Sequence, residues 1–122
     1  MNLKQIEGNL IVKLTFEFSL ELIKYCELLE TNRRYVIFNQ LLKSGTSIGA
    51  NVWEAQNSES KFDFIHKFKI AAKESDETKY WLLVCKYSCY YPDPNDLLER
   101  LDTIEKIITR IISSSKKSLK QN

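Results

Sequence analysis

The segment from residue 40 to residue 55, QLLKSGTSIGANVWEA, most strongly limits the folds open to this chain. It is rich in small and polar residues, yet its seam positions recur at intervals of three and four, the spacing of one helix face. This seam consists of Phe38, Leu41, Gly45, Ile48, Val52 and Ala55. A second stripe with the same spacing consists of Gln40, Ser44, Ser47, Asn51 and Glu54. A loop does not keep two interleaved stripes, so the segment is predicted to be a helix with an unusually thin middle.

Three further segments show the same periodicity, and short breaks separate them. Asn9 and Ser60 precede two of these segments as N-cap residues, and Tyr91-Pro92 ends the third helical segment. Short breaks between long helices make neighbouring helices antiparallel. The sequence therefore predicts an all-α protein, a single domain over residues 1–122, folded as an antiparallel up-down-up-down four-helix bundle. The expected helices span about residues 9–29, 35–57, 61–88 and 94–115.

The two ends of the chain are less regular than the segments between them. Leu3 and Ile6 either extend the first helix backwards or pack as a short arm. Lys116, Lys117 and Lys120 suit a helix C-terminus electrostatically, and we expect them to fray into solvent.

The small residues of the second helix are interpreted mainly as a packing motif. If the second and third helices fold back around residues 58–60, Ser44 and Gly45 face Ala71 and Ser75. Glycine in a helix costs about 1 kcal/mol relative to alanine, so two glycines need compensation from close packing or from function. A polar groove for a ligand is the alternative, with Glu54 as a general base instead of a paired carboxylate. The predicted helix-packing motif comprises Ser44, Gly45, Ser47, Gly49, Asn51, Glu54, Ala71 and Ser75.

The sequence shows no nucleophile–base pair, no second poised acid beside Glu54 and no cluster of metal ligands. It contains one histidine, His66, and three cysteines, an odd number that favours free thiols. Cys85 and Cys89 are four residues apart on one expected helix face, but two ligands do not make a metal site. We therefore interpret the cysteines as small buried side chains. The sequence predicts no catalytic residue, no metal, no cofactor and no enzymatic activity.

Charge and hydropathy limit the partners. Lys4, Glu7 and Lys13 interrupt any apolar run at the N-terminus, so no signal peptide is expected. No segment approaches the roughly 20 apolar residues of a membrane span. We therefore expect a cytoplasmic protein without a membrane partner. A net charge of +2 permits a nucleic-acid partner without requiring one.

Two parts of the chain carry a family resemblance. Residues 42–52, LKSGTSIGANV, are followed by Glu54-Ala55, and residues 70–75, 77–78 and 80–82 add IAAKES, ET and YWL. These motifs resemble the four-helix bundle proteins encoded within intervening sequences of bacterial 23S ribosomal RNA genes. The same family includes the accessory variability protein of diversity-generating retroelements, and the resemblance covers nearly the whole chain.

The resemblance implies a cytosolic homopentameric ring of bundles, without known enzymatic activity, whose partner is RNA or a reverse transcriptase. Position 43 is lysine where many members carry arginine, which keeps the charge but loses bidentate phosphate geometry. Structured RNA would be bound by basic side chains, with an ordinary solvated surface as the alternative interpretation. The candidate RNA-binding residues are Arg33, Arg34, Lys43, His66, Lys67, Lys69 and Lys73.

Aromatic residues outside the seams are more numerous than one bundle can bury on one face. Tryptophan and tyrosine are favoured at protein interfaces, so self-association is expected, with base stacking as the weaker alternative. The candidate oligomer-interface residues are Trp53, Phe62 and Trp81. The alternative function is a protein-interaction scaffold, or a reverse-transcriptase accessory protein without a direct role in nucleic-acid binding.

Overall fold

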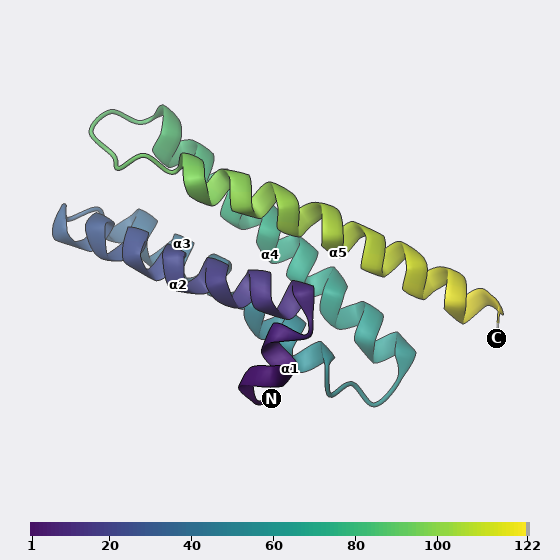
Figure 1. Ribbon diagram of the computed structural model, residues 1–122. Helices are drawn as coiled ribbons and strands as arrows, with labels where there is room; N and C mark the ends of the chain where they lie inside the picture. The colour runs from purple at the N-terminus through teal and green to yellow at the C-terminus, as the bar shows by residue number, and fades with distance from the viewer. Residues whose placement is uncertain (122) are drawn as a thin grey trace.

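The computed structural model describes residues 1–121 and the side chains of residues 1–120, and this part of the chain is helical throughout, without strands (Figure 1). Asn122, the last residue of the predicted domain, lies outside the described residues. The predicted all-α class is confirmed. The elements are α1 (Leu3–Glu7), α2 (Leu10–Thr31), α3 (Tyr35–Ala55), α4 (Lys61–Tyr87) and α5 (Asn95–Gln121).

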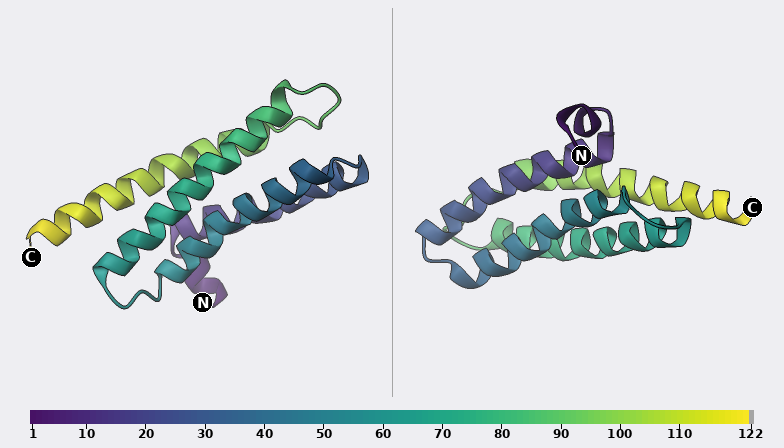
Figure 2. Two further views of the ribbon diagram at one scale, coloured as in Figure 1. Left: turned by 180° about the vertical axis from the view of Figure 1, so that it is seen from behind. Right: turned by 90° about the horizontal axis from the view of Figure 1, so that it is seen from below.

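The four long helices form the expected antiparallel bundle (Figures 1 and 2). In each sequential pair of helices, two contacts show that residue numbers rise along one helix as they fall along the other. Helices α2 and α3 meet at Gly45–Leu22 and Gly49–Thr15, and α3 and α4 meet at Ser44–Thr78 and Glu54–Lys67. Helices α4 and α5 meet at Ser75–Glu105 and Lys61–Ser118. Helix α2 also packs against α5, which closes the bundle.

The predicted N-caps begin two of the helices. The Asn9 side chain accepts a hydrogen bond from the Val12 backbone N–H at 3.3 Å, and Ser60 accepts one from Asp63 at 3.0 Å. Each bond satisfies one of the backbone donors that a helix N-terminus leaves without an intrahelical partner. These caps explain why α2 and α4 begin within one residue of the expected positions.

Both ends of the chain differ from the simplest expectation. Residues 3–7 form a separate short helix, so Leu3 and Ile6 do not extend α2. Helix α5 continues to Gln121, whereas we expected helix only to about residue 115 and fraying beyond it. That prediction was wrong because no glycine or proline interrupts the last turns, and Lys120 lies in the final turn, where a cation is favourable.

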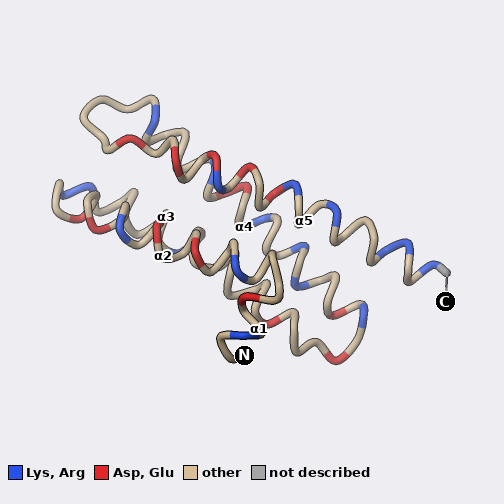
Figure 3. Tube along the Cα trace, viewed as in Figure 1, with Lys and Arg blue, Asp and Glu red and all other residues tan. Residues whose placement is uncertain are grey.

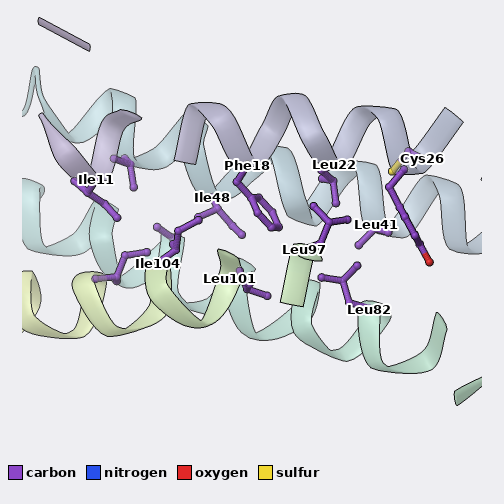
Figure 4. Packing of buried hydrophobic residues seen from close by; sticks show 14 of the residues in the cluster. Ile11, Phe18, Leu22, Cys26, Leu41, Ile48, Leu82, Leu97, Leu101 and Ile104 are labelled. Atoms are coloured by element: carbon purple, nitrogen blue, oxygen red, sulfur yellow. The ribbon is translucent and has the colours of Figure 1, made fainter. Parts of the chain in front are cut away.

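The core contains apolar side chains from all four long helices (Figure 4). Phe18 and Leu22 of α2 point toward Ile48 of α3 and Leu101 of α5, and all four are essentially inaccessible to solvent. Because the hydrophobic effect is roughly proportional to the apolar area removed from water, these side chains dominate the stability of the bundle.

The two glycines of α3 pack against α2, so the prediction that Gly45 faces α4 was wrong. A Cβ atom on Gly45 would lie 2.0 Å from Leu22 Cδ2, and one on Gly49 would lie 3.2 Å from the Thr15 carbonyl oxygen. Ser44 faces α4 instead, because adjacent helical residues point about 100° apart. The Ser44 and Thr78 hydroxyl groups form a hydrogen bond with each other at 3.0 Å, and both residues are buried.

Ala71 and Ser75 of α4 were expected to face Ser44 and Gly45, and Ser75 instead contacts α5. Ala71 is buried in the core, and the Ser75 hydroxyl donates to a Glu105 carboxylate oxygen of α5 at 3.0 Å. Ser75 therefore links α4 to α5. On α3, Gly45 of the seam therefore faces α2, whereas Ser44 and Glu54 of the polar stripe contact α4.

We expect Gly45→Ala to lower the free energy of unfolding by up to about 2 kcal/mol. Overpacking against Leu22 costs about 1–3 kcal/mol, which outweighs a gain of about 1 kcal/mol in helix propensity. In a Leu22→Ala background the clash is absent, so the same substitution should stabilise the protein. Urea unfolding of the unaltered protein, the two single variants and the double variant measures this coupling. Equal effects of Gly45→Ala in both backgrounds would contradict the packing argument.

Candidate nucleic-acid interface

Three of the predicted RNA-binding residues lie together on the outer side of α4. His66, Lys69 and Lys73 are separated by three and four residues, and all three are exposed. Among the described residues, none of them forms an ion pair with a carboxylate. This set, the α4 stripe, therefore presents two ammonium groups and an imidazole whose polar atoms are available to an anion.

Lys67, the fourth candidate on α4, is engaged within the protein. Its ammonium group lies 3.6 Å from a Glu54 carboxylate oxygen of α3, and 28% of the lysine side chain remains exposed. Glu54 is 57% exposed, so it is a paired carboxylate, as expected, but at the surface. Neutralisation by Glu54 makes Lys67 a weaker anion ligand than its neighbours on the α4 stripe.

The other predicted RNA-binding residues do not join the α4 stripe. Arg33 and Arg34 lie in the connection between α2 and α3, at the opposite end of the bundle from the start of α4. The Arg34 guanidinium stacks over the Tyr91 ring at 4.8 Å, which is a packing role. Lys43 is exposed on α3 beside Ser44, level with the C-terminal half of α4 through the Ser44–Thr78 bond.

The polar stripe of α3 satisfies its hydrogen bonds within the protein. The Ser47 hydroxyl donates to the Lys43 carbonyl at 2.7 Å, and the Asn51 amide donates to the Ser47 carbonyl at 2.8 Å. With the Ser44–Thr78 bond and the Glu54–Lys67 ion pair, the stripe has partners from Ser44 onwards. These bonds favour the packing interpretation over a polar ligand groove.

An apolar groove lies between α2 and α3, where Gly49 has no side chain to fill it. Its volume is about 330 Å³. Phe16 on its rim is 45% exposed, and Leu20 and Ile23 continue the apolar surface along α2. The residues that line this α2–α3 groove are Val12, Thr15, Phe16, Ser19, Gly49, Ala50 and Trp53.

The three predicted oligomer-interface residues do not form one surface. Trp53 lines the α2–α3 groove, whereas Phe62 lies at the start of α4 and is 72% exposed. Trp81 is half-buried near the other end of α4, edge-on to Tyr80 with ring centroids 5.0 Å apart. The sequence identified aromatic side chains outside the seams without showing which ones share a face.

Sequence reasoning missed a basic surface on α5, because it treated the last lysines only as a helix end. Lys106, Arg110, Ser113, Lys117 and Lys120 recur at intervals of four and three, and all five are exposed. We call this set the α5 stripe. The spacing, together with the absence of acidic residues after Glu105, is the signal that could have identified it.

The cysteines and acidic residues in the described part of the chain do not gather into a metal-binding cluster. No group of three or more histidine, cysteine or acidic side chains there could hold a metal ion. Cys89 lies beyond the end of α4 and is exposed, so it does not share a helix face with buried Cys85. Burial raises the pKa of the Cys85 thiol and raises that of Cys26 from 9.0 to about 12.

Comparisons with known proteins agree with this architecture. A family model described as 23S rRNA-intervening sequence protein matches residues 7–110. The chain belongs to this family. The resemblance predicted from the α3 and α4 motifs is thereby confirmed.

A solved structure from Bacteroides thetaiotaomicron supports the assignment. It is described as a protein with unknown function from the S23 ribosomal protein family, and it shares 33% sequence identity with this family member. The match has a TM-score of 0.79 and covers 84% of this chain and 97% of that chain. A comparison with curated proteins found no match. None of the described helices is long and apolar enough to cross a membrane.

We expect one of the three thiols to react rapidly with a disulfide reagent such as dithiobis(nitrobenzoate) while the protein is folded. Cys89 is exposed, whereas Cys26 and Cys85 are buried, and their raised pKa values keep the nucleophilic thiolate scarce. Denaturant should release the other two. Rapid reaction of all three in the folded protein would contradict the burial.

The same burial predicts an alkaline loss of stability. The pKa of the Cys26 thiol is higher in the folded chain than in the unfolded chain. The stability that the buried, protonated thiol contributes is therefore fully present below about pH 9.0 and is lost as the pH rises toward about 12. Urea unfolding across this range should show the decline, and Cys26→Ala should reduce its steepness. An unchanged pH profile in this variant would contradict the prediction.

Proposed function

We propose that this member of the 23S rRNA-intervening sequence protein family is a non-enzymatic homo-oligomer that binds structured RNA through basic surface residues. The observation that carries the proposal is the α4 stripe, His66, Lys69 and Lys73, exposed on one helix face without carboxylate partners. Lysines placed in this way contact phosphates without reading base sequence. RNA recognised through its backbone shape suits such a surface.

Aromatic side chains flank the α4 stripe. Phe62 lies one turn before His66, and Tyr80 lies two turns after Lys73, with exposed fractions of 72% and 60%. Aromatic rings beside lysines support contacts to unpaired bases at loops and bulges of a folded RNA. Exposed Asp76 and Glu77 lie between Lys73 and Tyr80 and reduce the local positive potential. We therefore propose modest affinity for each subunit.

Self-association would compensate for that modest affinity. A ring of five copies, as the family resemblance implies, repeats the α4 stripe five times, and linked weak sites bind together with much higher avidity. The α2–α3 groove supports this part of the proposal. Monomeric proteins rarely leave large contiguous apolar patches uncovered, and Phe16, Leu20 and Ile23 extend the groove into such a surface.

The same groove supports a second candidate function, a protein-interaction scaffold or an accessory protein for a reverse transcriptase. In that case the partner would cover the apolar surface of α2 and α3, and the α4 stripe would be an ordinary solvated face. Co-purification of a partner that survives nuclease treatment would favour this candidate.

We expect the full chain to shift labelled 23S ribosomal RNA fragments in an electrophoretic mobility assay at low salt. The affinity should fall steeply with ionic strength, because each phosphate contact releases counterions. Lys69→Ala with Lys73→Ala should weaken binding and reduce the magnitude of the slope of log K against log salt by about two.

Lys4→Ala with Lys24→Ala is the matched control, since it removes the same charge from α1 and α2, away from the α4 stripe. This control should bind RNA almost as tightly as the unaltered protein. Absence of any shift at low salt would refute the RNA-binding proposal.

We expect light scattering to give a mass several times that of one chain. Phe16→Glu with Leu20→Glu should produce monomers that keep their helical circular dichroism, because charges on the groove rim oppose its burial. Leu28→Glu is the control, since Leu28 is also exposed on α2 but lines a separate groove that includes Leu97 of α5. A monomeric unaltered protein would refute the homo-oligomer.

A further inference from the structure

Helix α5 separates its charges along its length (Figure 3). From residue 93 to residue 105 the chain has five acidic residues and one basic residue. From residue 106 to residue 122 it has five basic residues and no acidic one. A screened surface charge acts over about 10 Å, so the acidic half does not neutralise the far end of the basic half. The last four turns of α5 therefore carry a local field much stronger than the net charge of +2 indicates.

The basic half concentrates its charges on one outer line. In the α5 stripe, the four cations Lys106, Arg110, Lys117 and Lys120 share a helix face with Ser113. Lys106 pairs with Asp102 at 3.0 Å, where the acidic half ends. Among the described residues, Arg110, Lys117 and Lys120 have no carboxylate partner. At 1.5 Å per residue the stripe is about 21 Å long.

Neighbouring elements reinforce the stripe and do not cover it. The Lys61 ammonium group of α4 donates a hydrogen bond to the Ser118 hydroxyl, which adds a cation beside the last turns of α5. Those turns reach past the ends of α2 and α3 in all three views, so the basic end projects from the bundle (Figures 1 and 2). Lys117 and Lys120 also lie beyond residue 110, where the family match ends.

We propose that the α5 stripe is a second RNA site, separate from the α4 stripe, and that it binds the phosphate backbone of a double-helical RNA segment. The proposal rests on the proposed function, because it assigns part of the RNA contact to residues that the α4 stripe does not include. A straight, rigid row of cations suits the regularly spaced phosphates of a duplex. Arg110 adds the bidentate geometry that lysine lacks.

The burial of α5 argues against an anionic membrane as the partner. A basic amphipathic helix binds a membrane by inserting its apolar face among the lipids. In α5 that face is used within the bundle, since Leu97, Leu101, Ile104 and Ile108 are buried in the core. In the basic half, Ile111 and Ile112 are partly buried and pack against the same core. The exposed side offers charges and a hydroxyl group, which suit phosphates that remain in water.

The test is fluorescence anisotropy of the full chain with a labelled RNA duplex across a salt series. The variant Arg110→Ala, Lys117→Ala, Lys120→Ala should bind at least about tenfold more weakly near 0.1 M salt. Its slope of log K against log salt should be smaller in magnitude by about three. Circular dichroism and light scattering should match those of the unaltered protein, because the three side chains are exposed. Lys117→Arg with Lys120→Arg should retain the affinity.

Two comparison variants separate this inference from the proposed function. Lys4→Ala, Lys13→Ala, Lys24→Ala removes the same charge elsewhere and should bind the duplex almost normally. Lys69→Ala with Lys73→Ala tests the α4 stripe alone. If the α5 variant binds as tightly as the unaltered protein while the α4 variant is weakened, the α5 site is refuted and the proposed function stands.

Other results would also overturn the inference. Preference for a single-stranded RNA of equal length would refute the duplex assignment. If the α5 variant loses binding to phosphatidylserine vesicles but keeps its affinity for RNA, the stripe is a membrane contact. If the unaltered protein binds no RNA at low salt, both the proposed function and the α5 site are refuted.

Discussion

The packing of α2 against α3 depends on glycine at position 45 of α3, where no side chain separates the two helices. Gly45 leaves the space that Leu22 occupies, and Gly49 allows the Thr15 backbone to come close. This close approach sets the register of the first helical hairpin, and Ser44, one residue away, then meets Thr78 of α4. Two neighbouring positions in the sequence therefore position α3 against both adjacent helices, which is why small residues occupy the middle of this helix.

Helix boundaries could be predicted from the sequence because periodicity and capping are local properties. Asn9 and Ser60 cap the helices that they were expected to cap. The partner of Gly45 could not be predicted in the same way. Periodicity defines a face without saying which of two antiparallel neighbours that face contacts. The α5 end was also missed, because apolar periodicity weakens after Ile112 although nothing in the sequence stops the helix.

The candidate site was predictable in its residue types and much less so in its grouping. His66, Lys69 and Lys73 share a face because they lie on one helix, where spacing determines direction. Lys67 is next in sequence to His66, yet only the fold shows that Glu54 neutralises it. Trp53 and Phe62 prove to belong to different surfaces for the same reason: contacts between helices depend on tertiary packing that one-dimensional spacing does not contain.

The connectivity of the bundle has a consequence for how the chain folds. Each long helix packs against the next one in sequence, so most of the core assembles from segments joined by short turns. The hydroxyl of Tyr25 is different, since it reaches the Pro92 carbonyl across 67 residues at 2.7 Å. The contacts between sequential helices, by contrast, give the domain a low contact order, which is typical of domains that fold in microseconds to milliseconds. Docking of α2 against the start of α5 is therefore the step that bears most of the loop-closure entropy.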